Sequence, residues 1–211
     1  KATKLSVLAA PAKTQFTVGN TLDLSGVKLQ ITYNDGTQTP IFKADELEKY
    51  GVHVAFGKNG SFTTVAADKV LESADSGSTI VFYATDKLPS EYGSVVVASS
   101  TITVRSPLTV PALDLYVSAG KSAAQYPCTD NVTGGSGTYA TTVIEEKLPT
   151  GLNRTNLPGG KYNAFSYTGV VTASAGDYSS QYKISDTETQ ESIQVTVTIH
   201  VVPSDQAAFY S

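Results

Sequence analysis

Two histidines and a single cysteine are the side chains of this chain best suited to acid–base or nucleophilic chemistry. Nucleophilic catalysis needs a base next to the nucleophile, and that base is usually histidine. His53 and His200 lie in the polar phase of alternating segments, so we expect both on strands and facing solvent. Cys128 follows Tyr126-Pro127 and lacks the Gly-Ser-Cys-Trp-type context of a cysteine protease, which favours a small buried or half-buried thiol. We therefore expect no catalytic residue among the three.

Carboxylates are the next candidates, because a pair at the right separation can cleave glycosidic bonds. Glu145 and Glu146 are neighbours in sequence, so on a strand they point to opposite faces and do not converge. Asp186, Glu188 and Glu191 surround an expected hairpin, where acids are usually solvated. A calcium site is the alternative interpretation, since several oxygens on one loop can bind Ca²⁺. The Asp-x-Asn-Asp-Asn signature of cadherin linkers is absent, and we expect no metal ion, no cofactor and no enzymatic activity.

Aromatic rings offer a binding site rather than a catalytic one. The chain has 12 tyrosines, and exposed rings can stack on sugars. Tyr162, Phe165 and Tyr167 flank one loop and form the candidate carbohydrate platform, although such rings more often fill the core of a β-sandwich or its rim. The glycine-rich run at 134–137 lacks the Lys-Ser/Thr of a phosphate-binding loop and a following helix, so we expect a flexible turn there.

Composition and charge exclude several classes of partner. Lys and Arg number 15 against 19 Asp and Glu, the net charge is -4, and the basic residues are scattered, which argues against nucleic acid and anionic membranes. No apolar run approaches the roughly 18 residues of a membrane helix. With one cysteine and no tryptophan, the chain forms no internal disulfide and lacks the Trp of antibody domains. We expect a monomeric fragment whose natural N-terminus lies outside this sequence, since methionine is absent.

The elements that must position these residues are almost all strands. Charged residues are 16% of the chain, and apolar and polar residues alternate in Val27–Tyr33 and 193–201, as in half-buried strands. In the first of these, Val27, Leu29 and Ile31 are expected to face the core, and Lys28, Gln30 and Thr32 are expected to face water. Only 45–50, ended by Gly51, has the pattern of a helical turn. Further strands are expected at 80–84, 96–104, 140–144 and 178–185.

The chain divides where an alternating strand meets a proline. The strand at 100–104 ends in Arg105-Ser106-Pro107, and proline cannot continue a central strand. A new strand-like segment begins at Leu113, and the second half closes in the same way before Pro203. The sequence therefore predicts an all-β protein of two tandem domains, residues 1–105 and 106–211.

The first 37 residues carry the most specific pattern of the chain. Its members are Leu5, Pro11, Lys13-Thr14, Phe16, Val18-Gly19, Leu22-Asp23-Leu24-Ser25-Gly26-Val27, Tyr33 and Asp35-Gly36-Thr37. At this spacing, the segment resembles the bacterial Ig-like domains of group 3, which read roughly P-x-K-T-x-Y-x-x-G-x-x-L-D-L-S-G-L before a strand ending Y-x-D-G-T. The resemblance implies a repeat module of secreted or wall-anchored bacterial proteins, without catalytic residues.

The second half carries a looser pattern. It consists of Leu148-Pro149-Thr150-Gly151-Leu152, Thr168-Gly169-Val170, Gly176-Asp177-Tyr178 and Ser185-Asp186. These residues resemble the Ig-like or cadherin-like repeats of bacterial surface proteins. Together, the two resemblances imply that the two tandem domains are immunoglobulin-like β-sandwiches. They also imply a non-catalytic spacer or adhesion segment whose partner is an extracellular protein or a glycan. The alternative is a carbohydrate-binding accessory module of a cell-surface glycosidase.

Overall fold

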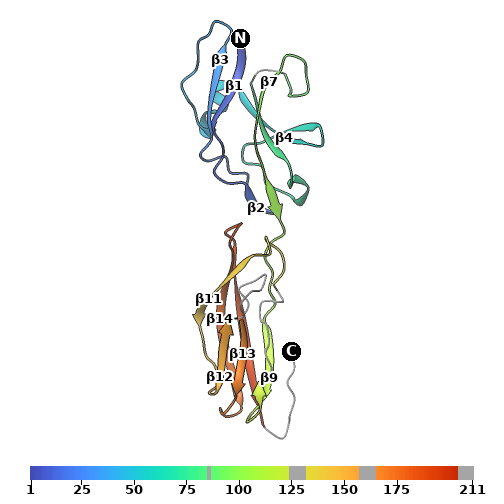
Figure 1. Ribbon diagram of the computed structural model, residues 1–211. Coiled ribbons are helices and arrows are strands. Elements are labelled where there is room, and N and C mark those ends of the chain that lie inside the picture. Colours follow the sequence, from blue (N-terminus) through green and yellow to red (C-terminus); the bar gives the residue numbers. More distant parts are fainter. Residues whose placement is uncertain (85–86, 124–131, 157–164, 204–211) are drawn as a thin grey trace. The chain divides into compact units, whose positions relative to one another are not determined.

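The chain forms two compact units, Lys1–Ser106 (unit 1) and Pro107–Ser211 (unit 2) (Figure 1). The computed structural model describes residues 1–84, 87–123, 132–156 and 165–203. Within these ranges every regular element is a strand or a short 3₁₀ turn, which confirms the predicted all-β class.

Unit 1 is built from one four-stranded sheet and smaller pairings that lie against it. The sheet has the order β5-β4-β6-β7, with all neighbours antiparallel. The strand β1 pairs antiparallel with β3, and β2 pairs parallel with β8. The strands are β1 (Ala2–Ala9), β2 (Gln15–Thr17), β3 (Lys28–Tyr33), β4 (Val52–Lys58), β5 (Ser61–Val65), β6 (Thr79–Ala84), β7 (Val95–Thr101) and β8 (Thr103–Arg105).

The predicted register of β3 is confirmed. Leu29 and Ile31 are at most 1% exposed, whereas Lys28 is exposed. Gln30 and Thr32 were expected in water but are half-buried. The segment after the β3 turn runs back beside β3, bridged to it at Thr32–Gln38 and Leu29–Phe42. From β3, the Gln30 side-chain amide donates a hydrogen bond to the Thr39 carbonyl of this segment (3.0 Å).

The helical pattern at 45–50 produces two separate 3₁₀ turns, η1 (Ala44–Glu46) and η2 (Glu48–Tyr50). As predicted, Gly51 ends the second turn; its φ of 65° is in the left-handed region that glycine adopts readily. A third 3₁₀ turn, η3 (Ser73–Asp75), has no counterpart among the predicted elements.

Unit 2 consists of two sheets. One has the order β11-β14-β15-β9, and the other has the order β10-β13-β12. Neighbouring strands are antiparallel except for β15 and β9, which are parallel. The strands are β9 (Leu113–Ser118), β10 (Ser122–Ala123), β11 (Tyr139–Glu145), β12 (Leu152–Asn156), β13 (Phe165–Val170), β14 (Gly176–Asp186) and β15 (Ser192–Val202).

The core of unit 2 lies between these sheets. On β15, Val195, Val197, Ile199 and Val201 are each at most 5% exposed, as the alternation predicts. The three-stranded sheet contributes Leu152 and Tyr167 to the same apolar cluster. Two packed sheets, with the last strand beside the first, form an immunoglobulin-like β-sandwich.

Candidate functional site

The predicted carbohydrate platform is not formed by Tyr167. This residue lies on β13 but is only 1% exposed, because its ring points into the core between the two sheets. A ring buried in this way cannot stack on a sugar, so the prediction of an exposed platform is wrong at this position. Tyr162 lies outside the described residues, and so does the side chain of Phe165.

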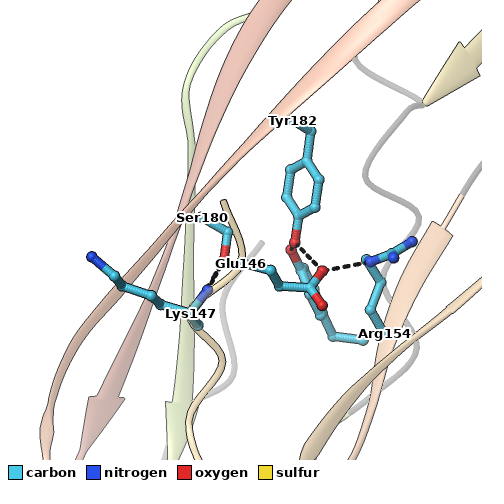
Figure 2. A network of polar contacts seen from close by, with 6 residues as sticks. Glu146, Lys147, Arg154, Ser180 and Tyr182 are labelled. Carbon is cyan, nitrogen blue, oxygen red and sulfur yellow. Dashed lines mark hydrogen bonds and ion pairs between the residues drawn. The ribbon is translucent and has the colours of Figure 1, made fainter. Parts of the chain in front are cut away.

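Instead, Tyr167 belongs to a polar network that joins the two sheets of unit 2, because its hydroxyl contacts that of Tyr182. Figure 2 shows Tyr182 with its other partner Glu146, and Arg154 beside them. The hydroxyl oxygens of Tyr167 on β13 and Tyr182 on β14 are 2.6 Å apart. The Tyr182 hydroxyl also lies 2.9 Å from Glu146 Oε2, a carboxylate oxygen that can only accept. Since each phenol has one proton, Tyr182 donates to Glu146 and Tyr167 donates to Tyr182.

Arg154 on β12 completes this network. Its Nε donates to the same Glu146 oxygen at 2.6 Å, and its guanidinium lies 5.8 Å from the centroid of the Tyr182 ring. The residue after Glu146 is anchored as well, because the Lys147 backbone N–H donates to Ser180 Oγ on β14 (2.9 Å). The network therefore connects β12 and β13 of one sheet with β14 of the other.

Burial, and to a smaller extent the Glu146 carboxylate, raise the pKa of Tyr182 to about 12 against the lowering by its hydrogen bonds with Tyr167 and Ser180. A phenol with such a pKa stays protonated at neutral pH, so no phenolate is present to act as a base. Its role in this arrangement is to donate a hydrogen bond, which is structural rather than chemical.

Asp186 was expected to be solvated, but it is 1% exposed. Its Oδ1 accepts hydrogen bonds from Ser136 Oγ (2.9 Å) and from the backbone N–H groups of Glu188 (2.9 Å) and Thr189 (3.0 Å). Burial raises the pKa of Asp186, but these backbone donors and that of Ser136 lower it by more, so the pKa lies below its ordinary value. Through these hydrogen bonds, the Asp186 carboxylate holds the turn between β14 and β15 next to the segment that contains Ser136.

The glycine-rich run at 134–137 packs against this carboxylate. A Cβ on Gly135 would lie 2.2 Å from Asp186 Oδ2, and the residue has a φ of 62°. Instead of being a flexible turn, the segment closes over Asp186, and only glycine allows that approach.

The two histidines differ in their surroundings. His53 on β4 is exposed, as predicted, and its ring centroid lies 5.0 Å from that of Tyr83. His200 lies on the polar face of β15, also as predicted, but its ring contacts two carboxylates. Nδ1 is 2.6 Å from Asp177 Oδ1 on β14, and Nε2 is 2.8 Å from Asp114 Oδ1 on β9.

The remaining candidate residues show no convergence. Glu145 pairs with Lys147 (2.9 Å) at the surface, whereas Glu146 faces Arg154, so the two acids have different partners. Among the described residues, no group of three or more His, Cys, Asp or Glu is placed to hold a metal ion. Cys128 lies outside the described ranges.

Unit 1 has an open hollow of about 540 Å³ beside η1. Its lining includes Lys13 and the acids Asp23, Asp45 and Asp68. The Asp23 carboxylate is used locally, because it accepts a hydrogen bond from the Ser25 backbone N–H (2.9 Å). Hydrogen bonds from the Ser25 side chain and backbone also lower the pKa of Asp23. Among the described residues, Asp23, Asp45 and Asp68 do not form a group placed to hold a metal ion.

Each unit has a parallel pair that includes its last strand; the partner is the first strand in unit 2 and the second strand in unit 1. In unit 2, β9 and β15 are parallel over six residue pairs, from Leu113 with Val197 to Ser118 with Val202. In unit 1, β2 and β8 are parallel over three pairs, from Gln15 with Thr103 to Thr17 with Arg105. No helix among the described residues is long and apolar enough to cross a membrane.

Comparison with known proteins gives matches only at the level of structure. No known protein family matches the sequence, and no curated protein matches it. A fragment of three titin Ig domains is 8% identical with a TM-score of 0.46, over 94% of this chain and 66% of the titin fragment. Sidekick-1 immunoglobulin domains 1–4 are 13% identical with a TM-score of 0.45, over 95% of this chain and 49% of that one.

Two further structures cover this chain at lower scores. A Drosophila N-cadherin fragment is 11% identical with a TM-score of 0.34, over 95% of this chain and 68% of that one. An endo-fucoidan hydrolase of glycoside hydrolase family 107 is 13% identical with a TM-score of 0.36, over 96% of this chain and 39% of that one. The chain thus spans just under two thirds of the titin fragment and about half of the Sidekick-1 fragment. The immunoglobulin-like arrangement is given by the strand order and the core of each unit.

Proposed function

We propose that this chain is a non-catalytic, load-bearing spacer or adhesion segment of a secreted or surface-anchored bacterial protein. The observation that carries the proposal is the parallel pairing of β2 with β8 and of β9 with β15. Because the paired strands run in the same direction, the chain enters each pair at one end and leaves it at the other. In unit 2 these are the first and last strands, so a pull on the two ends of the unit acts along β9 and β15.

This direction of force matters for mechanical strength. Hydrogen bonds between strands lie across the strand direction. A force along two parallel strands therefore shears all bonds of the pair together, whereas a force applied at one end breaks them one after another. The six residue pairs of β9 and β15 would share the load in unit 2.

The sequence supports the proposed type of protein. The resemblance of residues 4–37 to group 3 bacterial Ig-like domains, and of the second half to Ig-like or cadherin-like repeats, supports a module of a bacterial surface protein. We propose that the domains comprise residues 1–105 and 106–211. We also propose that the fragment is monomeric and binds an extracellular protein or a glycan.

Single-molecule pulling of unit 2 within the full chain tests this function. Two variants in a Cys128→Ser background place a handle either before β9, at Ala112→Cys, or after it, at Lys121→Cys; the second handle is at the C-terminus in both. Ala112 and Lys121 are exposed. The first geometry shears β9 from β15 and the second peels β15 away from the same end of the pair.

We expect a clearly higher unfolding force in the shear geometry. The extension gained there is about 300 Å, since some 90 residues at about 3.3–3.6 Å each become extended. Equal forces in the two geometries would contradict a load-bearing role for the terminal pair. Incubating the same fragment with glycan and extracellular-protein arrays then separates adhesion, which requires a bound partner, from a role as a spacer alone.

A further inference from the structure

The parallel pair that carries the proposed function is joined by a side-chain contact on its solvent face. His200 on β15 lies between the neighbouring strands, with Nε2 2.8 Å from Asp114 of β9 and Nδ1 2.6 Å from Asp177 of β14. Asp177 is the direct cross-strand partner of His200, and Tyr116 is its partner on β9. The Tyr116 ring stacks on the imidazole with a centroid distance of 4.5 Å and fixes its plane.

These contacts specify the protonation state of the ring. Both carboxylates can only accept hydrogen bonds, so both ring nitrogens must donate. Only the imidazolium has two N–H groups. In neutral imidazole, the lone pair of one nitrogen would face a carboxylate, and one of the two bonds would be lost.

We propose that His200 is a proton-controlled latch on the first strand of unit 2, closed when the imidazole carries two protons and open when it carries one. The proposal rests on the proposed function, because β9 and β15 are the strands that it loads. When the latch is closed, His200 holds β9 to β15 by a side-chain bond in addition to the backbone ladder. When it is open, β9 detaches at a lower force.

The direction of the pH dependence follows from the neighbours of the ring. Among the described residues, the titratable groups that contact it are Asp114 and Tyr116 on β9 and Asp177 on β14, while Thr198 and Val202, two residues away on β15, are uncharged. The hydrogen bonds to Asp114 and then Asp177 raise the pKa of His200 above its ordinary value of 6.5, with a smaller lowering by burial. The added stability is therefore complete below pH 6.5 and is lost as the pH rises through the raised pKa of the folded state.

Nuclear magnetic resonance of the full chain measures the latch directly. The chain has two histidines, so the imidazole region of the spectrum contains two sets of signals, which His53→Gln assigns. We expect the titration midpoint of His200 to fall when Asp114→Asn and Asp177→Asn are combined. An unchanged midpoint in this double variant would overturn the proposal.

Pulling in the shear geometry, with handles at Ala112→Cys and the C-terminus in the Cys128→Ser background, tests the mechanical consequence. At constant force, we expect unit 2 to unfold about two- to tenfold faster at pH 9 than at pH 6, the effect of losing one hydrogen bond. His200→Gln should remove the dependence on pH, and His53→Gln in unit 1 should preserve it. An unfolding rate that changes equally with pH in the His200→Gln variant would refute the latch.

The two proposals fail in different ways. If the shear and peel geometries differ but the shear rate does not depend on pH, the terminal pair bears load and His200 is not its latch. If the two geometries give the same force while the His200 midpoint falls in the double Asn variant, the side-chain contact exists but the load-bearing function is wrong.

Discussion

Removing the hydroxyl of Tyr182 tests the network that joins the two sheets of unit 2. Tyr182 is fully buried, and its oxygen accepts from Tyr167 at 2.6 Å and donates to Glu146 at 2.9 Å. Tyr182→Phe keeps the ring and deletes both hydrogen bonds. Tyr167→Phe deletes only one and leaves the bond between Tyr182 and Glu146 in place.

The magnitudes follow from the partners. A hydrogen bond between neutral groups contributes about 0.5–1.5 kcal/mol, and one to a charged group about 1.5–3 kcal/mol. The Glu146 side chain is 27% exposed and stays paired with Arg154, so the lower part of the second range applies. We expect Tyr182→Phe to reduce the free energy of unfolding of unit 2 by about 2–3 kcal/mol, and Tyr167→Phe by about 1 kcal/mol.

Urea titration of the full chain provides the assay, because each unit contains one histidine whose resonance reports its folded fraction. His200 reports unit 2, and His53 reports unit 1 as the internal control. In the double variant we expect non-additivity of about 1 kcal/mol, since both single changes delete the same bond between the hydroxyls. Two small, additive effects would show that the phenols do not connect the sheets.

The same network predicts a response to alkaline pH. Burial raises the pKa of Tyr182 to about 12 from an ordinary value of 10.0. The folded state therefore keeps a proton that the unfolded chain loses, and unit 2 should lose stability as the pH rises from about 10 to about 12. This loss should be smaller in Tyr182→Phe.

Two other predictions concern packing, each with a matched control measured in the same titration. In unit 1, Leu29→Ala should cost about 2–5 kcal/mol because it leaves a cavity at a fully buried site, whereas the exposed Lys28→Ala should change stability by no more than about 0.5 kcal/mol; equal effects would mean that the register of β3 is wrong. In unit 2, Gly151 (φ 93°) and Gly120 (φ 78°) both have a left-handed backbone, but a Cβ on Gly151 would lie 1.9 Å from the Val170 carbonyl oxygen, and one on Gly120 would meet nothing within 4 Å. We expect Gly120→Ala to cost about 1–2 kcal/mol, the strain alone, and Gly151→Ala to cost clearly more; similar costs would show that the close approach is not maintained in solution.

The parts of the fold that the sequence predicted are those set by local patterns. Alternation with a period of two is enough to divide β3 and β15 into buried and exposed faces, and glycine after Tyr50 is enough to end η2. The same rule was available for Asp186, since Ser180, Tyr182, Ile184 and Asp186 share one phase of β14 and all are buried. The prediction that Asp186 is solvated was wrong because it was based on the charge of the side chain and not on the position of the residue in this alternation.

The candidate sites depend on contacts that no local pattern contains. Asp114 and Asp177 are separated from His200 by 86 and 23 residues, so their approach follows from the order and register of β9, β15 and β14. Tyr167 lies on a short strand that ends in Val170, where alternation is brief and Gly169 interrupts it. Its burial follows from the sheet opposite, which provides the hydroxyl of Tyr182.

The two units hold their sheets together by different means, although neither has an intrachain disulfide. In unit 1 the core cluster is apolar and centred on large rings such as Phe16, Phe42 and Phe82, each fully buried. Such packing stabilises through the area removed from water and tolerates small shifts between sheets. In unit 2, Tyr167 and Tyr182 place hydroxyls in the core, where a displaced sheet would leave buried polar groups badly paired, at a cost of about 1–3 kcal/mol for each such group. The hydroxyl pair therefore adds directional specificity between sheets that apolar contacts alone do not provide, at the position in the sandwich where β13 faces β14.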